Sequence, residues 1–145
     1  MIMSVFSKIA LPDRPRPRVG LCAAVLGLST LVTLPAHAAS PLGVWLTPAD
    51  RNGQVAHIVA QQCGLYYCGT IARVFDQSGT QIAAPTVGQT VFWNMAADGD
   101  GYRGRAYVPA HKREYAAEMH VDGNRMTVSG CLGPICQSQV WQRVN

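Results

Sequence analysis

Hydrophobic and polar residues alternate with a period of two in the last third of the chain. From Tyr115 to Val121, every second residue is apolar or aromatic, whereas Glu118 and His120 lie between them. Residues 125–130 repeat the alternation, and Asp122-Gly123-Asn124 is typical of a tight turn. The two segments therefore predict an antiparallel β-hairpin with one face buried.

Similar short runs recur along most of the chain. Further strands are expected at about 43–47, 54–62, 66–75, 86–94, 102–108 and 138–144, which gives about eight in all. Residues 76–85 and 95–101 are expected to be the loosest stretches, and no segment after the N-terminal region has a long helical period. This pattern predicts an all-β fold, either a sandwich or a barrel. We favour a small antiparallel up-and-down β-barrel, because closure leaves no exposed strand edge.

The N-terminal region has the pattern of an export signal. Lys8, Arg14, Arg16 and Arg18 precede the uncharged residues 19–34, and Ala36-His37-Ala38 provides small residues at the usual positions before a cleavage site. We expect a signal peptide over residues 1–38, cleaved after Ala38, and a single domain over residues 39–145. The protein is then periplasmic or secreted.

Two other interpretations of this region are weaker. A membrane anchor requires about 20 apolar residues, so the uncharged stretch is short for one, and no stable membrane span is expected after cleavage. A lipoprotein attached through Cys22 is disfavoured by Leu21, which stands where a small residue is expected.

Removal of the leader also changes the charge. The whole chain has 12 basic and 8 acidic residues, whereas residues 39–145 have eight and seven. The basicity is therefore a targeting signal, and we expect no nucleic-acid partner.

Four cysteines remain after the leader: Cys63, Cys68, Cys131 and Cys136. In an oxidising compartment an even number predicts disulfides, although four cysteines allow three connectivities. Local geometry favours Cys63 with Cys68 and Cys131 with Cys136, each closing a four-residue connection. A zinc site is the alternative, but structural zinc sites usually have shorter Cys-x-x-Cys pairs. The same spacing disfavours a redox pair.

Several short motifs together resemble one family. They are Gly43-Val44-Trp45-Leu46-Thr47, Cys63-Gly64, Cys68-Gly69, Gly104-Arg105-Ala106-Tyr107, Tyr115, Ser129-Gly130-Cys131 and Gln139-Val140-Trp141-Gln142-Arg143. In this order they resemble the DUF2147 family of exported bacterial proteins, over residues 41–144. The resemblance implies a calycin-like or lipocalin-like barrel of unestablished biochemical role. Val108 and His111 depart from the family, which often has an acidic residue and a glycine there.

The resemblance also implies how the barrel is closed. In lipocalin-type barrels a Gly-x-Trp on the first strand packs beneath an arginine from the last, which assigns these roles to Gly43, Trp45 and Arg143. Trp141 shares the strand face of Arg143 and is expected to be structural too. A guanidinium over an indole gains about 0.5 to 2 kcal/mol.

Ligand binding is the favoured function, with a small amphiphilic or hydrophobic molecule held in the barrel. Arg73 lies between Ile71 and Phe75 on one expected strand face, where it would hold an anionic head group. Arg105, Trp93 and Tyr102 are further candidates near a barrel mouth. The competing interpretation places the arginines in solvent, and a small barrel can also be filled by its own side chains.

The alternative function is protein binding, for example inhibition of a secreted hydrolase. Tyr66 and Tyr67 in the first disulfide hairpin would form the contact surface.

Catalysis is not expected. His57, His111 and His120 have no metalloprotease or hydrolase spacing, and Asp98-Gly99-Asp100 is better explained as a turn than as a calcium loop. No catalytic residue, metal site or cofactor is assigned.

Overall fold

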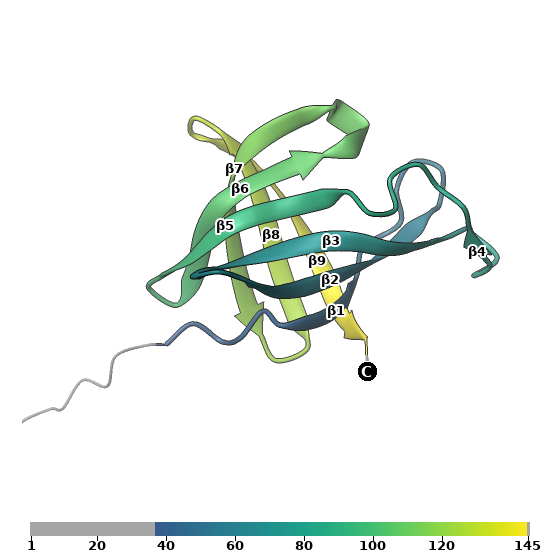
Figure 1. Ribbon diagram of the computed structural model, residues 1–145. Helices are drawn as coiled ribbons and strands as arrows, with labels where there is room; N and C mark the ends of the chain where they lie inside the picture. The colour runs from purple at the N-terminus through teal and green to yellow at the C-terminus, as the bar shows by residue number, and fades with distance from the viewer. Residues whose placement is uncertain (1–36, 145) are drawn as a thin grey trace, which may run out of the picture. The chain divides into compact units, whose positions relative to one another are not determined.

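The described part of the chain consists mainly of strands (Figure 1). The computed structural model describes residues 37–144, so most of the expected signal peptide lies outside the described residues. The strands are β1 (Gly43–Leu46), β2 (Val55–Cys63), β3 (Tyr66–Phe75), β4 (Gln81–Ile82), β5 (Thr90–Asp98), β6 (Gly101–Val108), β7 (Arg113–Asp122), β8 (Arg125–Leu132) and β9 (Ile135–Val144), with a 3-10 helix, η1 (Pro109–His111), before β7.

These strands form a closed antiparallel barrel. Their order in the sheet is β2-β1-β9-β8-β7-β6-β5-β3-β4, and pairing of β2 with β3 closes the ring. The two-residue β4 pairs only with β3, outside the ring, so eight strands make the barrel. The predicted fold class is confirmed. Within residues 37–144, no helix has the length and apolar character needed to cross a membrane.

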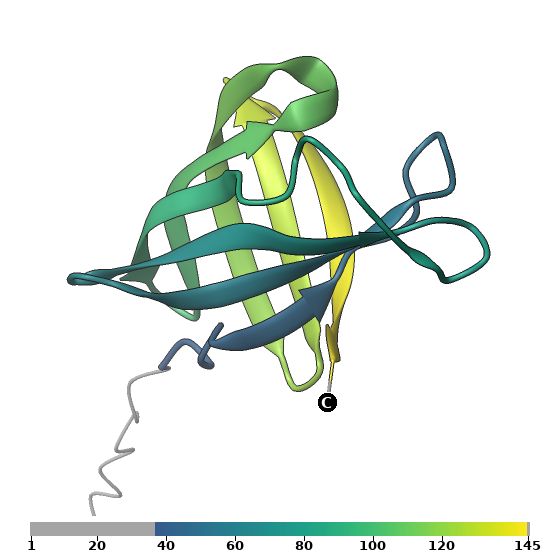
Figure 2. The same cartoon turned by 45° about the vertical axis from the view of Figure 1, so that its right-hand side comes forward.

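Because neighbouring strands run in opposite directions, successive connections lie at alternate ends of the barrel (Figure 2). We call one the plugged end; it comprises residues 38–42 and the turns at 64–65, 99–100 and 123–124. We call the other the mouth end; it comprises the connections 47–54, 76–89, 109–112 and 133–134.

Large apolar side chains fill the lumen. Trp45, Met95 and Met126 have no exposed surface, and Phe92 and Ile58 are at most 2% exposed. They come from four different strands, as expected when inward-facing residues of several strands share the lumen. The barrel therefore has a packed core.

Carbonyl groups of the N-terminal segment are bound at the plugged end. The Tyr102 hydroxyl donates to Ala39 O (3.1 Å) and Trp45 Nε1 donates to Pro41 O (2.8 Å). Arg143 donates to Ser40 O and Leu42 O, with its guanidinium carbon 4.2 Å from the centre of the Trp45 ring.

Gly43 makes room for this arrangement. A Cβ there would lie 2.9 Å from Arg143 Nη1, and its φ of +125° is one that other residues rarely adopt. The geometry that the family resemblance implied for Gly43, Trp45 and Arg143 is thus present. Trp141 faces the core beside them and is 6% exposed.

Each end carries one disulfide hairpin. Cys63–Cys68 closes the β2–β3 turn at the plugged end, with the Cα atoms 5.8 Å apart. Cys131–Cys136 closes the β8–β9 turn at the mouth end, with the Cα atoms 4.0 Å apart. The favoured local pairing is confirmed.

A bulge in β3 changes the direction of Arg73. His57 pairs with Arg73, but the next residue, Ile58, pairs with Ile71, so Ala72 is an extra residue. Such an insertion shifts the alternation by one position. Ile71 is consequently buried and Arg73 exposed. The prediction that they share a strand face is wrong.

A second bulge lies in β5. Trp93 pairs with Arg105 and Ala96 with Arg103, which leaves one extra residue on β5, and Asn94 has a φ of +53°. Gly104 faces this bulge, and a Cβ there would lie 2.6 Å from Met95 Sδ and from Trp93 O. The glycine therefore permits the close approach of the two strands.

The predicted position of β5 is also wrong. It runs over 90–98 and not 86–94, because residues 84–89 form turns with bonds from Val87 N to Ala84 O and from Gln89 N to Thr86 O. Residues 95–98, expected to be loose, belong to the strand.

Candidate functional site

The inner wall of the barrel is uncovered at the mouth end. On β7, β8 and β9, residues facing the axis are buried near the plugged end, where Met126 pairs with Trp141. Toward the mouth end, alternate residues on the same face become half-buried or exposed. We call these the mouth residues: Tyr115, Val128, Gly130, Gln137 and Gln139.

Strand register sets these residues in two rows. Ala117, Gly130 and Gln137 form one row, and Met119, Val128 and Gln139 form the next. Ala117 and Met119 are each 2% exposed, whereas Gln137 and Gln139 are exposed. The inner face therefore opens progressively from β7 to β9.

Hydrogen bonds hold two of the mouth residues in place. The Tyr115 hydroxyl lies 2.9 Å from His111 Nδ1, and its ring base lies beside Gly130. Trp141 Nε1 donates to Gln139 Oε1 (3.0 Å), which shows that both side chains lie on the inner face. Because its oxygen accepts this bond, Gln139 offers a ligand its NH2 group as a donor.

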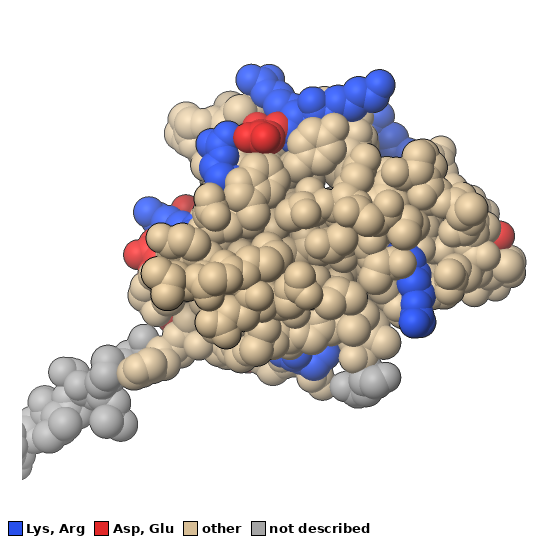
Figure 3. All heavy atoms as spheres, in the orientation of Figure 1, with Lys and Arg blue, Asp and Glu red and all other residues tan. Residues whose placement is uncertain are grey.

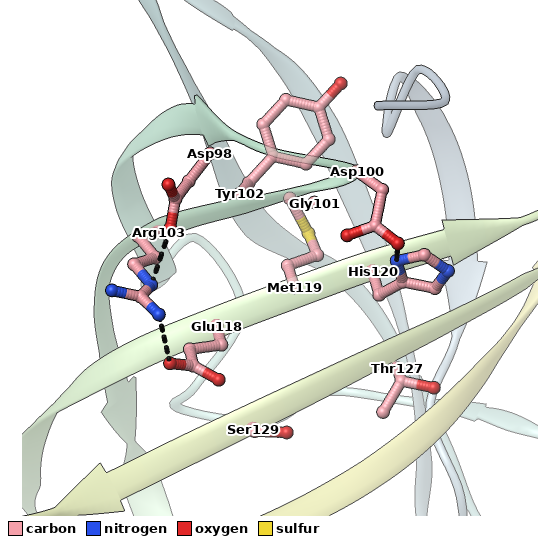
Figure 4. A pocket seen from close by; sticks show the side chains of 10 residues that line it. All are labelled: Asp98, Asp100, Gly101, Tyr102, Arg103, Glu118, Met119, His120, Thr127 and Ser129. Atoms are coloured by element: carbon pink, nitrogen blue, oxygen red, sulfur yellow. Dashed lines mark ion pairs between the residues drawn. The ribbon is translucent and has the colours of Figure 1, made fainter. Parts of the chain in front are cut away.

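A separate hollow of about 220 Å³ lies on the outside of the barrel, over β6, β7 and β8 (Figure 4). Arg103 bridges Asp98 (2.7 Å) and Glu118 (3.4 Å), and His120 Nδ1 lies 3.8 Å from Asp100. These side chains are at least half exposed, so their ion pairs are screened by water. Among residues 37–144, no three His, Cys, Asp or Glu side chains are placed to hold a metal ion.

A second hollow, of about 390 Å³, lies beside β4 and is lined mainly by small apolar groups such as Ala72, Ala83 and Ala84. It has no charged side chain in its lining. Neither hollow includes a mouth residue.

The four predicted ligand residues do not converge. Arg73 is exposed on the outer face of β3, opposite His57. Trp93 and Arg105 are neighbours on the outer face of β5 and β6, and Arg105 binds Glu114 at 3.1 Å. Tyr102 is 5% exposed and belongs to the core at the plugged end.

The two tyrosines of the first disulfide hairpin face opposite ways. Tyr66 is 42% exposed, whereas Tyr67 is half-buried and makes an edge contact with Tyr102, their ring centres 5.3 Å apart. They therefore do not form one contact surface. The exposed apolar residue of this hairpin is Leu65.

Burial shifts the pKa of two aromatic groups that pack in or beside the core. Burial lowers the pKa of His57, and the facing Arg73 guanidinium lowers it further. Burial raises the pKa of Tyr102, with a smaller contribution from Tyr67.

Gln137 and Gln139 were missed because polar residues in a strand are normally assigned to the solvent face. A signal was present in the sequence: counting back from Trp141 in steps of two puts both glutamines on the Trp141 face.

Comparisons with known proteins agree with this fold. A family model described as "Uncharacterized protein conserved in bacteria (DUF2147)" matches residues 43–143. Among solved structures, the barrel is similar to protein HP1028 from Helicobacter pylori, described as belonging to the lipocalin family. The TM-score is 0.59 at 12% identity, over 74% of this chain and 85% of that one. No curated protein matches.

Proposed function

Because this chain belongs to the DUF2147 family of bacterial proteins and has a lipocalin-like barrel, we propose that it binds a small amphiphilic or hydrophobic ligand. It acts as an exported carrier or sensor in the periplasm. The ligand lies at the mouth end, against the inner face of β7, β8 and β9.

One observation supports this site above the others. Residues on the core-facing side of β8 and β9 are partly or fully uncovered, although the same face is buried two residues further along. The inner face of a barrel is normally covered by side chains or by a ligand. This uncovered surface is therefore suited to binding a small molecule.

The lining indicates the chemistry of the ligand. An apolar chain would pack on the Tyr115 ring, Val128 and the backbone at Gly130. A polar group would accept hydrogen bonds from the amides of Gln137 and Gln139. These donors are neutral, so the ligand does not need the arginine counter-ion that the sequence suggested.

Filling the mouth tests the proposal. In Gly130→Leu, a leucine side chain occupies the space in front of Tyr115, and we expect the affinity for cis-parinaric acid, a fluorescent fatty acid, to fall at least about tenfold. The matched control is Ser129→Leu, which places the same side chain on the outer face of the same strand and should leave binding unchanged.

The outcomes separate the possibilities. Equal binding by wild type and Gly130→Leu would place the ligand elsewhere. If wild type binds no fatty acid and emerges empty from an oxidising periplasm in native mass spectrometry, the carrier proposal fails.

A further inference from the structure

The β8–β9 hairpin presents an apolar tip at the mouth end. Leu132 is 46% exposed and Ile135 is 72% exposed, with Gly133 and Pro134 between them. The Cys131–Cys136 disulfide closes the neck directly behind these residues. The two side chains are therefore held in water on a short, constrained turn, which is unfavourable unless they meet an apolar environment.

Basic residues lie at the same end of the barrel as this tip. The β7–β8 ladder ends at the mouth end with Ala116 opposite Cys131, and residues 112–115 precede Ala116 on the mouth side of the ladder. Lys112 and Arg113 are both exposed there. Segments 109–113 and 131–136 contain no acidic residue. Figure 3 shows Lys and Arg gathered at the top of the molecule, above the connection between β6 and β7.

The acidic residue next along the chain does not offset these charges fully. Glu114 is held by Arg105, with a nitrogen to oxygen distance of 3.1 Å. Lys112 and Arg113 take part in no ion pair found among the described residues.

The plugged end also has an exposed apolar tip, but the turn nearest to it is acidic. Leu65, in the other disulfide hairpin, is 91% exposed. The nearby β5–β6 turn carries Asp98 and Asp100. An exposed apolar tip is thus common to both ends, but the turn near Leu65 carries carboxylates, whereas the connection between β6 and β7 at the mouth end leads into Lys112 and Arg113.

We propose that the mouth end docks on the surface of an anionic lipid bilayer. Leu132 and Ile135 enter the headgroup region, and Lys112 and Arg113 contact lipid phosphates. Apolar burial and attraction to anionic lipid add in such binding. The docking does not require the ligand site, although it would turn the mouth residues toward the membrane.

A bilayer fits this surface better than a protein partner does. A stable protein interface covers about 800 Å² on each side. A two-residue apolar tip on a narrow turn is far smaller and protrudes, so it suits shallow insertion into a soft surface. Basic residues beside it match the negative charge of that surface.

Vesicle flotation with the mature protein tests the proposal. We expect binding to vesicles containing about a third phosphatidylglycerol and little binding to pure phosphatidylcholine. Ile135→Ser should weaken binding about tenfold. Lys112→Asn with Arg113→Gln should weaken it about 25-fold and remove its salt dependence. Asparagine suits position 112, where φ is +49°.

Leu65→Ser is the matched control and should leave binding unchanged, because it removes a more exposed apolar side chain from the tip at the other end. An equal loss in Leu65→Ser, or equal binding to neutral vesicles, would overturn the proposal. A second result would also overturn the docking proposal. The wild type would not bind vesicles but would form dimers in sedimentation velocity, and Ile135→Ser would abolish the dimers. The tip would then serve self-association. Gly130→Leu should still dock, so docking and ligand binding fail independently.

Discussion

Arg143 connects the last strand to the segment that precedes the first. It donates to the carbonyls of Ser40 and Leu42 and covers the Trp45 ring. This arrangement was predictable because Gly43, Trp45 and Arg143 belong to a recognisable family motif. Stacking and two charge-assisted hydrogen bonds make it the main polar contact of the plugged end.

Arg143→Gln should lower the free energy of unfolding by about 2 kcal/mol, because it removes the stacking and at least one carbonyl bond. Urea denaturation measures the loss. Arg125→Gln, an exposed arginine on the neighbouring strand, should change it by less than about 0.5 kcal/mol. An equally small change in Arg143→Gln would contradict a closing role.

Arg73 was misplaced from the sequence, and Gln137 and Gln139 were missed. The direction of Arg73 depends on a bulge at Ala72, and nothing in the local alternation marks it. Gln137 and Gln139 face inward because the pattern continues from Trp141, and their polarity conceals this. For most strand residues, the alternation along the strand and the polarity of the side chain indicate the same face of the sheet. At Gln137 and Gln139 they indicate opposite faces, and these residues belong to the candidate site.

Among the elements, the two disulfide hairpins followed most directly from the sequence. Their identical spacing and four-residue connections predicted local pairing. The limits of β5 were harder to predict from the sequence, because they are set by turns at 84–89 and by the bulge at Asn94. Both depend on contacts with neighbouring strands.

Replacing Cys131 and Cys136 together by serine should lower the free energy of unfolding by about 2 kcal/mol, because the closed loop is short. The Cys63 and Cys68 pair should behave in the same way, and the two losses should add, since the bridges lie at opposite ends. Guanidinium denaturation measures both. A loss above about 4 kcal/mol would instead indicate a bridge between distant segments.

The molecule as a whole has two unlike ends. The segment 38–42 and the core side chains bound to it close one end, whereas uncovered inner-face residues lie at the other. The sequence predicted the barrel but not the difference between its two ends. Each end is formed by alternate connections that lie far apart in the sequence, and the fold is needed to bring them together. The proposed ligand site and the proposed docking surface both lie at the mouth end, an arrangement suited to transfer of an amphiphile between membrane and barrel.

The most direct test is an NMR titration of the mature, oxidised protein with lauric acid. We predict that the side-chain amide signals of Gln137 and Gln139 and the backbone amide of Gly130 shift together with one affinity, while Asp98 and Asp100 signals stay in place. Shifts confined to the outer hollow over β6, β7 and β8, or the absence of any saturable shift, would contradict a ligand site in the mouth.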